Sequence, residues 1–272
     1  MPQAFGISEF KPLSVGAVVT GAVQLYRDNF KQYLKIAFFS TLWLIVPVFG
    51  WAKGLAGFAL ISRLAFNEIS GKSEDEQVAR SIVDQRKWTF LGALLLLFLF
   101  YTLFYIGAIS IALALGFMFG ALGFASNPNP VFTALVFLLA FLVTFSAILW
   151  IVTRFFIQDV ALAIEDGSGA SGSLKRSWSL TKGSVFRLQL VILVGTLITG
   201  PFVLISQGVS FAFQSFSGVD ANPLVALVLS FALIGITLTN SALLSPFWQA
   251  IKALVYADLL TRREGVDLEL RG

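Results

Sequence analysis

Histidine and cysteine are both absent from this chain of 272 residues. Without them the protein has no disulfide, no thiol nucleophile, no zinc or haem site built on those ligands, and no imidazole acid or base. We therefore assign no catalytic, cofactor-binding or metal residues and expect a protein that is not an enzyme.

Charge is also scarce, at 12% of residues, against about a quarter in soluble domains. No charged side chain occurs from residue 89 to 153, and Asn127-Pro128-Asn129-Pro130 is the break in that run. Residues 188–251 repeat the pattern around Asp220. Since roughly 20 apolar residues span a bilayer core, each stretch predicts a membrane hairpin.

Amphipathic segments precede the apolar stretches at residues 14–29, 73–88 and 171–186. They predict an all-α, polytopic membrane helix bundle with about six transmembrane helices in three hairpins, each preceded by an amphipathic interfacial helix. The chain would form one integral membrane domain, residues 1–272, with repeat-like units at 14–70, 73–166 and 171–265. The alternative to a true repeat is that charged boundaries precede helices in any polytopic protein.

The sequence signal for the first hairpin is the weakest of the three. Residues 36–66 are long enough for two crossings if the chain bends near Pro47 and Gly50. Lys53 and Arg63 bracket a short apolar run there, so one crossing followed by an interfacial helix is the alternative.

Lysine and arginine flank the apolar spans and do not form one continuous stripe, which argues against nucleic acid as the partner of this chain with net charge +4. If both termini are cytoplasmic, six crossings put every Lys and Arg except Lys53 on the cytoplasmic side, as the positive-inside rule requires. Five crossings would put whole basic segments outside. We expect a multi-pass protein of the bacterial cell membrane.

Basic and aromatic residues at these boundaries are candidates for binding anionic lipid headgroups on the cytoplasmic face. The candidates are Arg27, Lys31, Arg86, Lys87, Trp88, Arg176, Trp178, Lys182, Arg187, Arg262 and Arg263. The alternative is a belt of paired charges that fixes helix depth, in which Asp258 and Arg262 are four residues apart on one helix face. A third hypothesis, a membrane-embedded enzyme, would use Asp159, Glu165 and Asp258.

Neutral polar residues mark the last apolar stretch, and the candidate polar track consists of Gln207, Gln214, Thr237 and Asn240. Facing one another they could line a path for a small or amphiphilic solute. Alternatively they hydrogen-bond helix to helix, as is common in membrane bundles.

Residues 174–183 read Leu-Lys-Arg-Ser-Trp-Ser-Leu-Thr-Lys-Gly, and residues 256–268 read Tyr-Ala-Asp-Leu-Leu-Thr-Arg-Arg-Glu-Gly-Val-Asp-Leu. These two motifs resemble the membrane-domain family named after glycerophosphoryl diester phosphodiesterase, with Leu260 in place of the usual arginine. Residues 12–30 are similar to the family's usual start. The resemblance implies a bacterial membrane bundle without the catalytic barrel, and hence no phosphodiesterase activity. It also places Trp178 at headgroup level, and Gly183 and Gly265 at helix ends.

We thus expect a non-enzymatic integral membrane protein that serves as an accessory, anchoring or lipid-associated module. Membrane lipids, and a membrane protein that it anchors, would be its partners. A transporter or permease is the alternative.

Overall fold

The computed structural model describes residues 13–72, 74–121, 130–216 and 223–265, and this part of the chain is helical without strands. The helices are α1 (Val15–Asp28), α2 (Phe30–Trp43), α3 (Phe49–Ile69), α4 (Glu76–Gln85), α5 (Lys87–Ala121), α6 (Pro130–Arg154), α7 (Gln158–Ile164), α8 (Ala170–Thr181), α9 (Val185–Phe216) and α10 (Pro223–Leu260), followed by a π-helical turn, Thr261–Gly265. The all-α prediction is confirmed.

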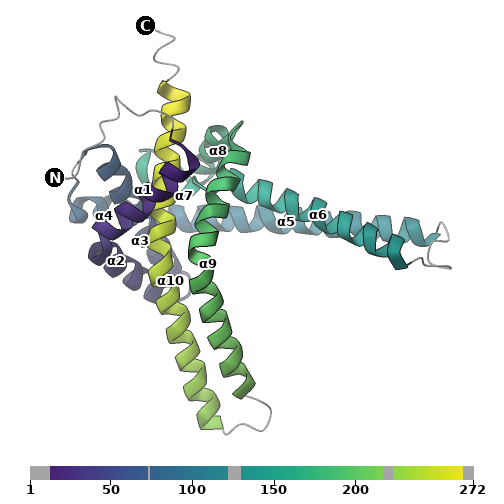
Figure 1. Ribbon diagram of the computed structural model, residues 1–272. Coiled ribbons are helices and arrows are strands. Elements are labelled where there is room, and N and C mark those ends of the chain that lie inside the picture. The colour runs from purple at the N-terminus through teal and green to yellow at the C-terminus, as the bar shows by residue number, and fades with distance from the viewer. Residues whose placement is uncertain (1–12, 73, 122–129, 217–222, 266–272) are drawn as a thin grey trace.

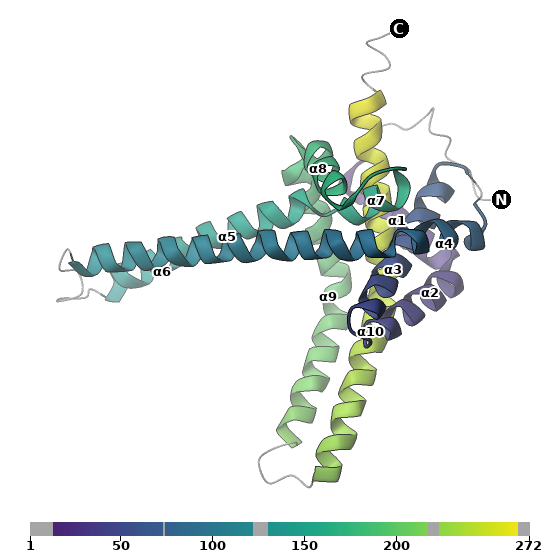
Figure 2. The same ribbon diagram turned by 180° about the vertical axis from the view of Figure 1, so that it is seen from behind.

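Short helices form a compact head from which two long hairpins project (Figure 1). The head consists of α1–α4, α7, α8 and the adjoining ends of the four long helices. The hairpins α5–α6 and α9–α10 leave it in different directions, as the view from behind also shows (Figure 2).

Local sequence explains several helix boundaries. Ser14 caps α1 by accepting a hydrogen bond from the amide of Ala17 (3.1 Å), and Asp75 caps α4 through the amide of Gln77 (3.2 Å). Pro130 and Pro223 begin α6 and α10, since proline loses no hydrogen bond at a first helical position. Gly183, with φ of 80°, separates α8 from α9 as predicted.

The inner half of α10 is the centre of the head, and α1, α2 and α3 pack around it. The largest fully buried side chains include Tyr33, Leu60, Ile61, Ile251 and Tyr256. Burial of each large apolar side chain stabilises the head by about 1.5–3 kcal/mol. The head is therefore held by a protein core, whereas the outer parts of the hairpins expose apolar side chains throughout, as at Phe117, Phe137 and Leu204.

Four helical segments of the described chain are long and apolar enough to cross a membrane: Lys87–Met118, Ala134–Ile164, Val185–Phe213 and Leu224–Arg263. They belong to the two predicted hairpins, and they indicate association with a membrane. The helices α2 and α3 are not among them, so six crossings are not confirmed. With 14 residues, α2 is about 21 Å long, short of a bilayer core of about 30 Å.

The three segments expected at the membrane interface are helices, close to the predicted bounds. Each buries one side against the head: Val18 and Ala22 of α1, Ala79 and Val83 of α4, and Ser177 and Leu180 of α8 are buried. Contact with other helices accounts for these buried residues, whereas Val78 of α4 stays exposed.

Candidate functional site

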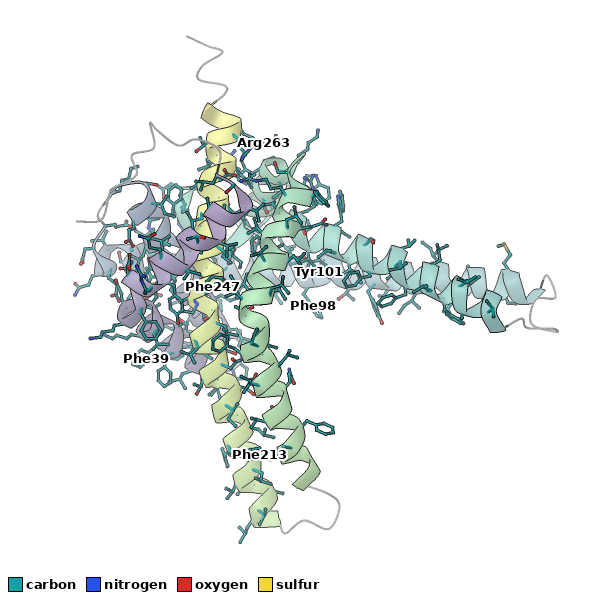
Figure 3. The ribbon with its side chains drawn as sticks, viewed as in Figure 1. Phe39, Phe98, Tyr101, Phe213, Phe247 and Arg263 are labelled. Carbon is teal, nitrogen blue, oxygen red and sulfur yellow. The ribbon has the colours of Figure 1, made fainter. Side chains whose placement is uncertain are left out.

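Charged side chains of the four long helices lie at the ends that join the head. Lys87 begins α5, Arg154 ends α6 and Arg187 is in the first turn of α9, while Lys252 and Asp258 belong to the inner end of α10. Arg263 follows α10 at the far side of the head, and Phe213 lies toward the outer end of α9 (Figure 3). The described outer parts of both hairpins carry no charge.

Asp258 is the centre of one cluster of charges. Its side chain is 3% exposed and accepts hydrogen bonds from Arg187 (2.5 Å), Arg262 (3.0 Å) and the backbone amide of Leu13 (2.8 Å). Both arginines also donate to the carbonyl of Leu13. The predicted pairing of Asp258 with Arg262 is present, and this cluster ties the start of the chain to α9 and α10.

Glu165, after α7, is the centre of a second cluster. Its carboxylate accepts hydrogen bonds from Arg176 of α8 (2.5 Å) and from the hydroxyl of Tyr256 of α10 (2.7 Å). Arg86 donates to the carbonyls of Leu162 (3.2 Å) and Glu165 (2.8 Å) and pairs with Asp166 (2.6 Å). These contacts hold the joint before α5 against the segment that follows α6.

Arg154 is a buried cation without a carboxylate partner in the described chain. It is 4% exposed, and its guanidinium lies 4.1 Å from the ring centroid of Trp178 and 5.5 Å from that of Trp150. It donates to the hydroxyl of Thr181 (3.3 Å). The two indole faces supply the electrostatic attraction that a carboxylate would otherwise give.

Five of the eleven predicted headgroup ligands are therefore bound to other parts of the protein. Arg86, Arg176, Arg187 and Arg262 form ion pairs, and Arg263 donates to the carbonyls of Leu180 and Lys182. Their pairing is the alternative that the sequence left open.

The remaining candidate headgroup ligands are either exposed on the surface or in contact with aromatic side chains. Lys31 and Lys182 are exposed, and Arg27 forms a surface pair with Asp28. Lys87 lies over the ring of Phe49, and the ring of Trp88 packs beside that of Phe49. Trp178 covers Arg154. The side chains that the structure leaves for lipid are chiefly lysines.

Among the described side chains of the predicted polar track, no hydrogen bond joins one member to another. Gln207 and Thr237 are exposed and Asn240 is half-buried, and within the described residues none of the three has a hydrogen bond. The side chain of Gln214 is outside the described residues. Thr199 and Thr239, on the same two helices, donate to carbonyls of their own helices.

The three carboxylates of the enzyme hypothesis are also kept apart. Asp159 pairs with Lys252 (2.7 Å), Glu165 with Arg176, and Asp258 with Arg187. Among the residues that the structure describes, no cluster of three carboxylates could hold a metal ion.

Two cations that lie against aromatic rings, Arg154 and Lys53, were not among the site residues predicted from the sequence. Arg154 reads as an ordinary charged end of an apolar helix, and its burial depends on Trp178, which is 24 residues further along the chain. Lys53 appeared as an exception to the charge pattern, but it lies 4.8 Å from the ring centroid of Trp43 and 5.6 Å from that of Phe49. Its position beside aromatic residues was the available signal.

Residues 15–259 match the family described as Domain of unknown function (DUF7847), and the chain belongs to that family. Comparison with curated proteins gives no match, and comparison with solved structures gives none either. The resemblance to the glycerophosphoryl diester phosphodiesterase membrane-domain family thus stays a prediction.

Proposed function

We propose that this protein is a non-enzymatic, multi-pass protein of the bacterial cell membrane that serves as an accessory or anchoring module and associates with anionic lipid headgroups. The observation that supports it is the segregation of charge: the described outer parts of both hairpins carry none, and the charged residues lie in the head. Apolar helices of this length are stable in hydrocarbon, and a basic head attracts an anionic membrane surface.

The proposed topology has α5, α6, α9 and α10 as crossings and both termini in the cytoplasm. Four crossings keep every described Lys and Arg on the cytoplasmic side, in agreement with the positive-inside rule. The six crossings expected from the sequence would add α2 and α3 and would carry Lys53 toward the other side. We therefore favour four.

Anchoring is favoured over transport because α9 and α10 expose the candidate track residues Gln207 and Thr237. A solute path would need them to face a cavity shared by several helices. The cavity of about 60 Å³ beside Ser40 and Lys53 lies between α2, α3 and α4, away from the track.

Single cysteines test the topology, since the chain has no cysteine of its own. K31C and K182C report on the head, and M118C and V225C on the outer ends of α5 and α10. In intact cells we expect an impermeant maleimide to label M118C and V225C and to spare K31C and K182C. Labelling of either head cysteine from outside would overturn the proposal.

Lipid preference and partners need separate measurements. Phosphatidylglycerol should raise the thermal midpoint of the purified protein more than phosphatidylcholine does, and added salt should reduce the difference. Equal shifts at low salt would remove the lipid part of the proposal. An anchoring role further predicts a membrane protein that copurifies reproducibly from mild detergent, and its absence would remove that part.

A further inference from the structure

Residues 43–51, which we name the knuckle, connect α2 to α3 and expose an apolar surface. Its exposed large side chains are Trp43, Ile45, Val46, Val48, Phe49 and Trp51, at 38% to 58%. Turns in water are usually built from Gly, Asn, Asp and Ser. Here Val48 instead takes a φ of 60°, an unusual conformation for a β-branched residue.

The knuckle is supported rigidly by close packing of α2 on α3. A Cβ atom at Gly54 would lie 2.8 Å from the carbonyl oxygen of Ser40 and 2.7 Å from a methyl of Leu44, and one at Gly57 would collide with the hydroxyl of Ser40. Because both sites exclude a side chain, the two helices approach closely and the knuckle is a fixed projection of the head. Phe39, labelled in Figure 3, extends its apolar surface along α2.

The depth of the knuckle follows from the packing of α3 along α10. The side chain of Ser62 donates to that of Gln249 (2.6 Å), and the rings of Phe66 and Tyr256 lie 5.6 Å apart, so both helices run in the same direction. Both rise by about 1.5 Å per residue, which puts Phe49 at the level of about residues 236–239 of α10. That level is within the exposed apolar part of α10 that we assign to the membrane.

Two lysines without carboxylate partners in the described chain border the knuckle. The ammonium groups of Lys53 and Lys87 lie 5.6 Å and 5.3 Å from the ring centroid of Phe49, whose ring is 6.1 Å from that of Trp88. Trp88 belongs to the first turn of α5, where a proposed crossing begins. The apolar surface of the knuckle is thus continuous with a membrane span and carries two lysines at its edge.

We infer that the knuckle is a re-entrant segment inserted among the acyl chains of the cytoplasmic leaflet, and that Lys53 and Lys87 bind the phosphodiester groups of anionic phospholipids at its edge. Lysines at such an edge can extend toward the headgroups while aromatic rings cover their stems. The inference rests on the proposed orientation of α9 and α10. It replaces the first of the expected hairpins with a segment that enters and leaves on the same side.

Depth-dependent quenching of a fluorescent label on V46C tests the insertion. The matched control is V78C in α4, because Val46 and Val78 are 45% and 51% exposed, and L139C reports on the crossing of α6. In vesicles we expect nitroxides on the acyl chains to quench V46C and L139C, and aqueous iodide to quench V78C.

The outcomes separate the inference from the proposed function. If L139C is quenched by lipid nitroxides while V46C is quenched by iodide, the knuckle is in water and the inference fails alone. Protection of V46C from both quenchers would mean that a protein or a second copy covers the knuckle, which also overturns it. Labelling of V46C from outside intact cells would show that α2 and α3 cross the membrane as the first expected hairpin. Iodide quenching of L139C would instead contradict the proposed membrane topology itself.

The lysines are tested by the double variant K53Q/K87Q against K72Q/K175Q, which removes two exposed lysines elsewhere on the head. We expect the apparent affinity for phosphatidylglycerol to fall about fivefold per lysine at the knuckle. Equal losses in both variants would show a general charge effect and overturn the assigned phosphate site.

Discussion

The guanidinium of Arg154 stacks on the indole of Trp178, 4.1 Å from the ring centroid, and the ring of Trp150 lies within 5.4 Å of that of Trp178. Arg154 ends α6 and Trp178 belongs to α8, so the stack joins a membrane span to the head. A buried cation with no carboxylate depends on such contacts.

A double-mutant cycle over this pair should show strong coupling. W178L removes the ring from a desolvated cation, and we expect it to lower the free energy of unfolding by about 2 kcal/mol more in the wild-type background than in R154M. Unfolding in mild detergent, followed by tryptophan fluorescence, measures the difference. Strict additivity of the two substitutions would show that the stack contributes only packing.

Asp258 should be the most sensitive carboxylate of the head. D258N keeps the shape of the side chain but leaves Arg187 and Arg262 close together without their anion, and we expect a loss of about 3–5 kcal/mol in unfolding free energy. The control is D28N, since Asp28 and Arg27 form an exposed pair that should contribute less than about 1 kcal/mol. Comparable losses in both variants would contradict the role given to burial.

Tyr26 should make the head sensitive to alkaline pH. Its hydroxyl donates to the carbonyl of Leu243 (2.9 Å), and burial raises the pKa of Tyr26 to about 12. An unfolded tyrosine ionises near pH 10, so the folded state retains a proton that the unfolded state releases, and stability should fall from about pH 10 to 12. Y26F should make this fall shallower in unfolding measurements, and an unchanged slope would refute the assignment.

Composition and charge spacing predicted the all-α class and the four long apolar helices, because each charge-free run is long enough for two membrane-spanning helices. The helix starts at Pro130 and Pro223 have an equally local cause, since proline loses no hydrogen bond at a first helical position. The segment 73–88 was expected as one helix, whereas α4 covers Glu76–Gln85 with Asp75 as its cap.

Contacts between residues that are far apart in the chain could not be predicted from the sequence. Arg176 and Tyr256 meet at Glu165, and Arg187 meets Leu13 at Asp258, across separations that no local spacing encodes. A pattern of basic residues at helix ends looks the same whether they face lipid or carboxylates. The sequence therefore indicated candidate headgroup ligands of which only some are free of other contacts.

The divergence of the two hairpins in Figure 1 leads to a prediction about the protein in a bilayer. The described outer parts of both hairpins are uncharged and expose many apolar side chains, and a flat hydrocarbon core of about 30 Å solvates both only if they lie side by side. Reorientation requires α5 and α6 to bend where they leave the head.

Spin labels on M118C and V225C, at the outer ends of α5 and α10, should therefore be closer together in lipid nanodiscs than in detergent micelles, whose curvature permits divergent hairpins. The pair F211C and V225C, within the α9–α10 hairpin, is the control and should give the same distance in both, because α9 and α10 pack against each other. If the distance between hairpins is unchanged by the bilayer, the joints are rigid. One of the two hairpins must then lie along the membrane surface, where its exposed phenylalanines would be accessible from water.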